Sequence, residues 1–331
     1  MRKVPSITLG CLFAALLVGF STNGCMVRKS IVLDFQPESI EETSTVPQYF
    51  WPLTGRVAPN GIITNRRPIS MKIENSLEAR PQSGLINADI VYEVEVEGGI
   101  TRFHVLFQSD LPEIAGPLRS ARSSDAWIVP QWDSYLLYSG STEAVRADLE
   151  NAGIDKIPEE VDARIWQRVD WRYAPHNLYV HIADVPDVIG DFGVTTDGWE
   201  ARTLAFEDTL TNETPTVTSI TVPFPAQTSI WRWDNVGRQF LRFQEEEAHT
   251  DRDSGIQIGA ENVVVLWADY YDFASGGKAT LFKNGVAHEG VWIAQAGQPP
   301  LIETLSGEVI TYRTGKTWFE IVSPDTEIVV E

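Results

Sequence analysis

Cysteine is almost absent from this sequence, and its placement excludes several kinds of site. The 331 residues include only two cysteines, Cys11 and Cys25, both near the N-terminus. A disulfide framework or a thiolate metal site in the body of the protein would need cysteines further along the chain. We therefore expect neither, and the chain is long enough to bury a sizeable core without them.

Basic residues are also scarce relative to acidic ones. The sequence has 26 lysines and arginines against 46 aspartates and glutamates, which gives a formal net charge of −20. Such a surface repels the phosphates of nucleic acids and anionic lipid headgroups. We expect no nucleic-acid partner, and any local cluster of arginines is informative against this acidic background.

Motifs typical of metal and cofactor sites are missing as well. The sequence has no H-E-x-x-H pair, no Walker loop and no glycine-rich dinucleotide fingerprint. The stretch 249–257, HTDRDSGIQ, lacks the aspartate ladder and the final glutamate of a calcium loop. We therefore expect no cofactor and no metal.

The N-terminus has the features of an export signal. Arg2 and Lys3 precede the apolar run ITLGCLFAALLVGF, which is followed by STNGC. We predict a lipoprotein signal peptide over 1–25 with Cys25 as the lipidated residue, although Thr22-Asn23-Gly24 departs from the usual residues before such a cysteine. An ordinary secretory signal and an uncleaved anchor are the alternatives.

No later apolar run approaches the length of a membrane span. We therefore predict a protein that faces outside the cytoplasm and is held at the cell membrane by its N-terminal lipid. Residues 26–48 end in a stretch rich in Ser, Thr, Glu and Pro, which is typical of a flexible tether.

The remaining chain predicts an α+β fold with two domains. Residues 49–210 mix strand and helix patterns and predict an N-terminal α+β domain; residues 211–331 consist of short β-type runs separated by turn dipeptides. The latter predict a smaller β-rich domain. Four tryptophan-containing runs in it favour a β-domain core over a sugar-stacking face.

A run of alternating glutamates is the first candidate site. In VYEVEVEGGITRFH, residues 91–104, Glu93, Glu95 and Glu97 share one face of a strand. The pattern alone favours a half-buried strand with its acidic face in water. The glycine pair that follows predicts a tight hairpin, which could bring Arg102 and His104 opposite or diagonal to the glutamates.

The second candidate is GPLRSARSSD, residues 116–125, at the expected start of a helix. Arg119 and Arg122, the neighbouring serines and free backbone N–H groups would suit a phosphate or carboxylate. Alternatively, Ser120 or Ser123 only caps the helix and the arginines pair with nearby acidic residues.

Two further stretches carry polar residues of interest. YSGSTEAVRADLE lacks the G-x-S-x-G of a nucleophile elbow, so Ser141 is expected to be a helix N-cap. In RYAPHNLYVH, His176 follows a proline and could act as a base or be purely structural. His176 and His181 are five residues apart and do not form a chelating pair in a strand.

Three ordered motifs carry a family resemblance. RPISMKIENSLEARPQSGLINADIVYEVEVEGGITRFHVLF, GPLRSARSSD and APHNLY resemble the YerB-like bacterial lipoproteins, a family of unknown function, and the tail from GGKATLFKNGVAHEGVWIAQ to YRTGKTWFEIV resembles the family's C-terminal domain. The resemblance implies a two-domain envelope lipoprotein of uncharacterised role. The motif residues of the family fall here on Glu93, Glu97, Arg102, Arg119, Ser120, Arg122, His176 and Asn177. Glu95 and His104 fall outside the family pattern.

Three functional hypotheses remain open at this stage. A binding protein would grip an anionic envelope component or envelope protein with Arg102, Arg119, Ser120, Arg122 and Asn177. A cell-wall glycan or peptide hydrolase or transferase would use Glu93 or Glu97 as the acid or base and His176 as a second base. A structural salt-bridge network would leave the binding face elsewhere.

Overall fold

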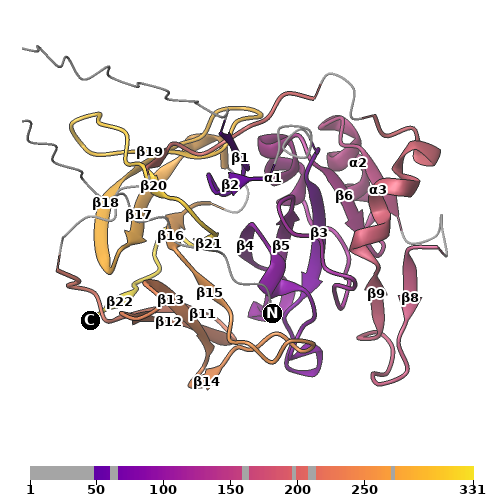
Figure 1. Ribbon diagram of the computed structural model, residues 1–331, viewed down its shortest axis with the longest axis horizontal. Coiled ribbons are helices and arrows are strands. Elements are labelled where there is room, and N and C mark those ends of the chain that lie inside the picture. The colour runs from indigo at the N-terminus through magenta and orange to yellow at the C-terminus, as the bar shows by residue number, and fades with distance from the viewer. Residues whose placement is uncertain (1–47, 60–65, 159–163, 196–198, 208–213, 270–272) are drawn as a thin grey trace, which may run out of the picture. The chain divides into compact units, whose positions relative to one another are not determined.

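A ten-stranded mixed sheet forms the centre of the fold (Figure 1). The computed structural model describes residues 48–59, 66–158, 164–195, 199–207, 214–269 and 273–331. In spatial order, the sheet consists of β19 (Leu301–Glu303), β18 (Val286–Ile293), β17 (Gly277–Lys283), β16 (Asn262–Trp267), β21 (Thr317–Val322), β4 (Ile90–Glu95), β5 (Thr101–Phe107), β3 (Ile69–Glu74), β6 (Tyr135–Tyr138) and β7 (Lys156–Pro158).

Strands from both halves of the chain build this sheet. β21 pairs in parallel with β4, with Thr317 opposite Ile90 and Ile321 opposite Val94. On the other side, β21 pairs in parallel with β16. The strands of the C-terminal half therefore continue the sheet that β3, β4 and β5 begin, and the predicted α+β fold class is confirmed.

A second sheet consists of C-terminal strands alone. Its order is β14 (Glu247–Ala248), β13 (Gln239–Gln244), β12 (Gln227–Asp234), β11 (Ser219–Phe224) and β22 (Val329–Val330), and β15 (Gly259–Ala260) also pairs with β13. Three two-stranded pairs complete the strands of the described ranges: β1 (Tyr49–Phe50) with β2 (Val57–Ala58), β8 (Trp166–Arg168) with β9 (Leu178–Val180), and β10 (Phe206–Glu207) with β20 (Tyr312–Arg313).

Helices are short and lie mostly in the N-terminal half. They are α1 (Asp125–Trp132), α2 (Glu143–Asn151) and α3 (Val185–Val188), with single 3-10 turns at Leu77–Ala79, Leu85–Asn87, Glu97–Gly99, Ile182–Asp184, Ile189–Phe192 and Phe273–Ser275. The predicted cap of α2 is wrong by one residue. Thr142, not Ser141, has the extended N-cap conformation, and its hydroxyl accepts a hydrogen bond from the Val145 N–H at 3.3 Å.

Both faces of the ten-stranded sheet are buried at its central strands, from β16 to β3, whereas β18 near the edge is partly exposed. On β4, Val91 belongs to the core cluster that includes residues of the second sheet, whereas Tyr92 and Val94 belong to the cluster that includes Trp132 of α1. The expectation that the C-terminal tryptophans are core residues is confirmed for the four that are buried: Trp231, Trp267, Trp292 and Trp318. A strand covered on both faces leaves little room for a wet acidic side, which bears directly on Glu93.

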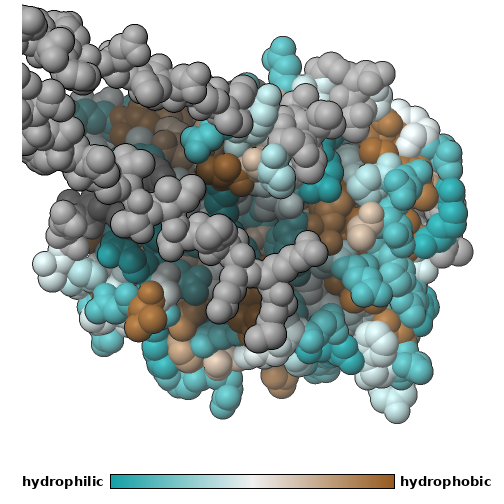
Figure 2. All heavy atoms as spheres, in the orientation of Figure 1, coloured by the Kyte–Doolittle hydropathy of each residue, from teal (hydrophilic) through white to brown (hydrophobic). Residues whose placement is uncertain are grey.

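The surface is mostly hydrophilic where Figure 2 shows it, and apolar side chains form separate patches. Among the described residues, no helix is both long enough and apolar enough to cross a membrane.

Candidate functional site

The predicted hairpin forms, but its register separates Arg102 from Glu93 and Glu95. β4 and β5 are antiparallel, and Glu93 lies opposite Phe103 while Arg102 lies opposite Val94. The turn closes between Val96 and Ile100, so odd-numbered residues pair with odd-numbered ones. Arg102 therefore shares a face with even-numbered neighbours, and the predicted cluster of Arg102 and His104 with the glutamates is wrong for Glu93 and Glu95. Glu97, in the turn, still acts electrostatically on Arg102.

On its own face, Arg102 lies next to β3 and the GPLRSAR segment. Its register partner on β3 is Glu74, and its Nη1 donates to the Ser120 carbonyl at 2.8 Å. The residue is only 8% exposed. Within the described part of the chain, no carboxylate forms an ion pair with it.

Arg119 and His176 meet at the same glutamate. Arg119 Nη2 is 3.3 Å from Glu74 Oε1, and His176 Nδ1 is 2.9 Å from Glu74 Oε2. Glu74 is almost fully buried, while the arginine and histidine side chains are partly exposed. Residues more than 100 positions apart therefore converge on one carboxylate.

Arg122, from the same GPLRSAR segment as Arg119, pairs with a different carboxylate, that of Glu97. Its Nη2 and Nε donate to Glu97 Oε2 at 2.6 and 2.9 Å. The hydrogen bond from Arg122 is the main reason why the pKa of Glu97 is lowered. The Glu97 side chain is 72% exposed, so this pair contributes little to stability and is open to competition by a ligand.

We call Arg102, Arg119 and Arg122 the arginine cluster. The pKa of Arg102 is lowered to about 10, mainly by burial and then by the positive charges of Arg122 and Arg119. Glu74 and Glu97 oppose this effect. Three guanidinium groups thus lie close enough to repel one another, with two carboxylates between them.

A buried row of polar side chains, Lys72, Asp125, His104 and Ser70, lies next to the arginine cluster. Asp125 Oδ1 binds Lys72 Nζ at 2.7 Å and His104 Nδ1 at 2.8 Å, and Oδ2 accepts a hydrogen bond from the Arg122 N–H at 2.7 Å. Burial raises the pKa of Asp125, but Lys72 and His104 outweigh burial and hold it below its usual range. Asp125 is therefore an anion that fixes the backbone of Arg122.

Ser70, His104 and Asp125 follow one another as the serine, histidine and aspartate of a hydrolase triad do. His104 Nε2 is 3.0 Å from Ser70 Oγ, and Ser70 Oγ is 2.5 Å from Ser134 Oγ. Ser70, His104 and Asp125 are all fully buried. The arrangement consequently offers no surface on which Ser70 could meet a substrate, and its direct role is to hold strand and helix together.

The prediction of free N–H groups at the start of α1 is wrong. The N–H groups of Asp125, Ala126 and Trp127 donate to the carbonyls of the three residues before the helix, at 2.9 to 3.1 Å. The turn that precedes α1 satisfies these donors internally. Any anion at this place would be held by the guanidinium groups and not by the helix terminus.

Two predicted ligand-binding residues have local partners. Ser120 is partly exposed, and its carbonyl accepts the hydrogen bond from Arg102. Asn177 Oδ1 accepts a hydrogen bond from Arg168 Nη1 at 3.0 Å across the β8–β9 hairpin. Ser120 therefore lies within the arginine cluster, whereas Asn177 stabilises the hairpin that carries His176.

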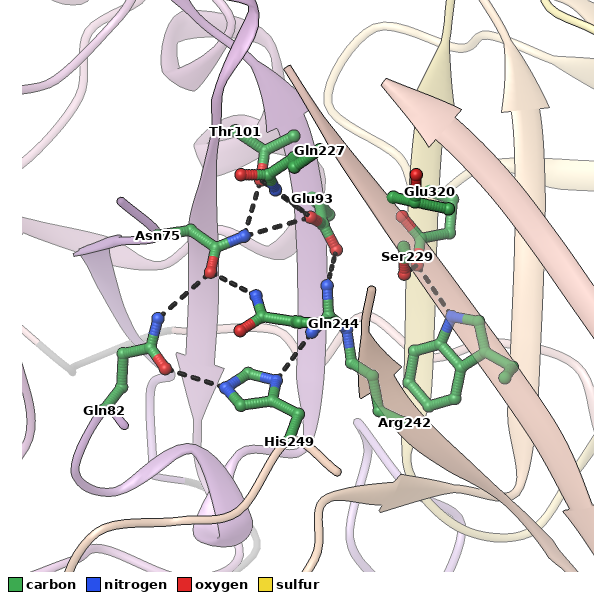
Figure 3. A network of polar contacts seen from close by, with 12 residues as sticks. Asn75, Gln82, Glu93, Thr101, Gln227, Ser229, Arg242, Gln244, His249 and Glu320 are labelled. Carbon is green, nitrogen blue, oxygen red and sulfur yellow. Dashed lines mark hydrogen bonds and ion pairs between the residues drawn. The ribbon is translucent and has the colours of Figure 1, made fainter. Parts of the chain in front are cut away.

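Glu93 lies in a separate, buried network, and the prediction of a wet acidic face is wrong for it (Figure 3). Arg242 Nη2 is 2.6 Å from Glu93 Oε2, and both side chains are fully buried. Glu93 Oε1 accepts hydrogen bonds from Asn75, Thr101 and Gln227. β12 and β13, which supply Gln227 and Arg242, cover this face of β4.

Arg242 links Glu93 to further buried polar groups. Its Nη1 lies 2.6 Å from His249 Nδ1, and His249 Nε2 lies 2.7 Å from Gln82 Oε1. Burial is the main cause of the strongly lowered pKa of His249, and the charge of Arg242 adds to it. These contacts join β4 to the second sheet, so Glu93 belongs to the packing between the two halves of the chain.

Sequence reasoning missed Glu74, the residue on which the cluster converges. Its signal was present in PISMKIEN, since Ser70, Lys72 and Glu74 alternate along one face of a strand. The predicted lipidation residue Cys25 lies outside the described residues. Within the described ranges, no group of His, Cys, Asp and Glu could hold a metal ion.

The chain belongs to a family of proteins of unknown function. Residues 53–195 match the N-terminal domain and residues 220–319 the C-terminal domain of "Protein of unknown function (DUF3048)". The predicted resemblance is thereby confirmed, and two domain models span most of the chain. The domain boundaries predicted from composition remain a prediction.

Within this family, the chain is similar to a protein of Bacillus subtilis (strain 168). The "Putative lipoprotein YerB" is 29% identical over 291 residues, which cover 83% of this chain and 86% of that protein. The crystal structure of the YerB protein from Bacillus subtilis has a TM-score of 0.76 at 29% identity, over 85% of this chain and 100% of that one.

Proposed function

We propose that the protein is an extracytoplasmic lipoprotein that binds an anionic component of the cell envelope through the arginine cluster. The ligand group is a phosphate or carboxylate, because guanidinium groups bind both with paired N–H donors.

The observation that carries this proposal is the unbalanced charge at Arg102. Glu74 neutralises Arg119, and Glu97 neutralises Arg122, but Arg102 has no carboxylate of its own among the described residues. Burial and two neighbouring arginines make its charge costly, as its lowered pKa indicates. A bound anion would relieve this repulsion and would gain three guanidinium partners.

Accessibility favours the same place. The side chains of Arg119 and Arg122 are 24% and 21% exposed, so both can reach a ligand. The pair of Arg122 with Glu97 is at the surface, and a ligand phosphate could replace the glutamate at small cost. His176 is also partly exposed, and it lies next to Arg119 because both side chains contact Glu74.

The N-terminal part of the proposal is a lipid anchor at Cys25. Its support is the charged, apolar and small-residue pattern of residues 1–25 and the name of the lipoprotein to which the chain is similar. Metabolic labelling with an alkyne analogue of palmitate tests it. The label should appear on the wild type and disappear in Cys25→Ala; labelling that persists in the variant would contradict the anchor.

Binding is tested by titrating the full-length protein, in detergent, with two probes of matched length. One is a glycerol-phosphate oligomer and the other is oligoglutamate, which distinguish phosphate from carboxylate recognition. Arg119→Gln should weaken the affinity for the preferred probe about tenfold, because a charge-assisted hydrogen bond is lost.

The matched control is Arg232→Gln. Arg232 is an exposed arginine on β12 of the second sheet and is paired with Glu246, so it has the same chemistry in a different place. Its substitution should leave the affinity unchanged. Equal losses in both variants would mean that the probe responds only to overall charge, and the proposed site would be refuted.

A further inference from the structure

A second polar site, separate from the arginine cluster, lies beside the β8–β9 hairpin. A cleft of about 790 Å³ is formed by the segments Gly84–Asn87, Asp110–Ile114 and Asp251–Ile256 together with residues of the hairpin. Its volume is in the range of pockets for small organic ligands. It lies outside the arginine cluster and shares none of that cluster's residues.

Acidic side chains dominate the charge of this cleft. Asp110, Glu113, Asp251 and Asp253 line it. Arg252 is one counter-charge nearby, since its Nη1 binds Asp253 Oδ1 at 2.7 Å. Lys316 and Arg66 interact electrostatically with Asp110. Asp110 Oδ2 has an uncharged partner, the amide of Asn87 at 2.6 Å.

Asp251 provides an independent indication of a ligand. The residue is only 2% exposed, and its Oδ1 accepts hydrogen bonds from the N–H groups of Asp253 and Ser254 and from the Ser254 hydroxyl. Its Oδ2 is buried and has no hydrogen-bond partner among the described residues. A buried carboxylate oxygen without a donor is costly, and Asp251 is one of the residues that line the cleft.

The walls of the cleft suit a cation that is carried on an apolar stem. Ile86, Ile114 and Ile256 line it together with Trp171. The Trp171 ring already has a guanidinium over it, because the Arg252 Cζ lies 4.3 Å from the ring centroid. An aromatic ring and aliphatic walls are suited to the methylene chain of a lysine or arginine, and the carboxylates to its charged end.

We propose that this cleft binds the lysine or arginine side chain of a peptide segment from a partner protein, with Asp251 as the buried acceptor. A bare divalent cation is a poorer occupant, because the carboxylates that line the cleft do not gather into a metal-ligating group in the described ranges. A cation also makes no use of the apolar walls. The proposal does not depend on the anion site, and either site could fail without the other.

The test uses the full-length protein and an acetylated, amidated trilysine peptide. A second peptide, in which the three lysines are Nε-acetylated, keeps the length and loses the charge. Because the net charge of −20 attracts any polycation weakly, the readout is the ratio of affinities between variants. Calorimetry should show binding of trilysine and none of its acetylated form.

Asp251→Asn is the decisive variant, and Asp234→Asn is its matched control. Asn keeps the acceptor Oδ1 but replaces the charged Oδ2. Asp234 forms a similar turn on the second sheet, where it accepts hydrogen bonds from the N–H groups of Val236 and Gly237. Asp251→Asn should weaken trilysine binding about tenfold or more, and Asp234→Asn should leave it unchanged.

Several results would overturn the proposal. They are equal affinity for the two peptides, equal affinity of wild type and Asp251→Asn, or a calcium-induced rise in Tm that Asp251→Asn abolishes. If Asp251→Asn does not fold, Glu113→Gln replaces it, since Glu113 is exposed and its substitution leaves the core intact. Glu113→Gln should weaken binding about threefold; an unchanged affinity would overturn the proposal as well.

Discussion

Arg242 and Glu93 form an ion pair that is closed off from water, and Arg242→Met tests how strongly the two halves of the chain depend on it. The substitution keeps an apolar stem of similar length. It leaves Glu93 Oε2 without a partner among the described residues, because Arg242 Nη2 is the donor to that oxygen at 2.6 Å. Both side chains are fully buried, so water cannot replace the lost contact.

The magnitude follows from the burial of the charge. Breaking a fully buried ion pair from one side costs about 3–5 kcal/mol. The guanidinium also lies 4.9 Å from the centre of the Trp318 ring and donates to His249, so Arg242→Met falls toward the upper end of this range. At about 2–4 °C per kcal/mol, the expected fall in Tm is on the order of 10 °C.

Urea unfolding of a double-mutant cycle measures this directly. Glu93→Gln alone leaves the positive charge of Arg242 buried without its carboxylate partner. The double variant Glu93→Gln with Arg242→Met removes both charges of the pair. We expect the double variant to lose at least about 2 kcal/mol less than the sum of the two single losses. A loss below about 1 kcal/mol for Arg242→Met, or additive effects, would refute the reasoning that the pair is buried and charged.

Two further predictions concern groups outside the arginine cluster. Burial, and then the charge of Glu93, raise the pKa of Glu320 to about 8. Between its ordinary pKa of 4.5 and about 8, the folded state therefore holds a proton that the unfolded state has released, so stability falls as the pH rises, by at most about 1.4 kcal/mol per pH unit. Glu320→Gln should flatten this slope in urea unfolding at pH 5.5 and 8, and an unchanged slope would contradict the assignment. Thr142→Ala should cost about 1 kcal/mol in the same assay, because the α2 cap is lost, whereas Ser141→Ala should cost clearly less; equal losses would contradict Thr142 as the cap.

Local patterns in the sequence predicted the elements of the N-terminal half well. Alternating residues in PISMKIEN and around Glu93 correspond to β3 and β4, and the glycine pair corresponds to the β4–β5 turn. These signals are local, since period and turn residues depend on a few neighbouring positions. The convergence of Arg119 and His176 on Glu74 is not local, because the three residues come from segments far apart in the sequence.

The environment of Glu93 could not be predicted in the same way. The residue is buried because Gln227 and Arg242 reach it from strands more than 130 positions later in the chain. Nothing within the glutamate run signals that cover. The parallel pairing of β21 with β4 is equally remote in sequence, and it turns β4 from a half-exposed strand into an interior one.

The register of the hairpin decided which charged residues could meet. An acid–base cluster of Glu93 with Arg102 required a turn that pairs odd with even positions. The closure between Val96 and Ile100 gives the other parity, so Arg102 lies opposite Glu74 on β3 instead. A shift of one residue would have exchanged the two faces, and sequence period alone does not determine it.

The proposal that the arginine cluster binds an anion is best tested by the ratio of affinities between Arg119→Gln and Arg232→Gln. Both proteins are titrated with the glycerol-phosphate and glutamate oligomers at low and high salt. We expect Arg119→Gln to bind the preferred oligomer about tenfold more weakly at low salt and Arg232→Gln to bind it like the wild type. The affinity of Arg119→Gln should also depend less on salt. Equal affinities of the two variants for both oligomers would contradict the proposal.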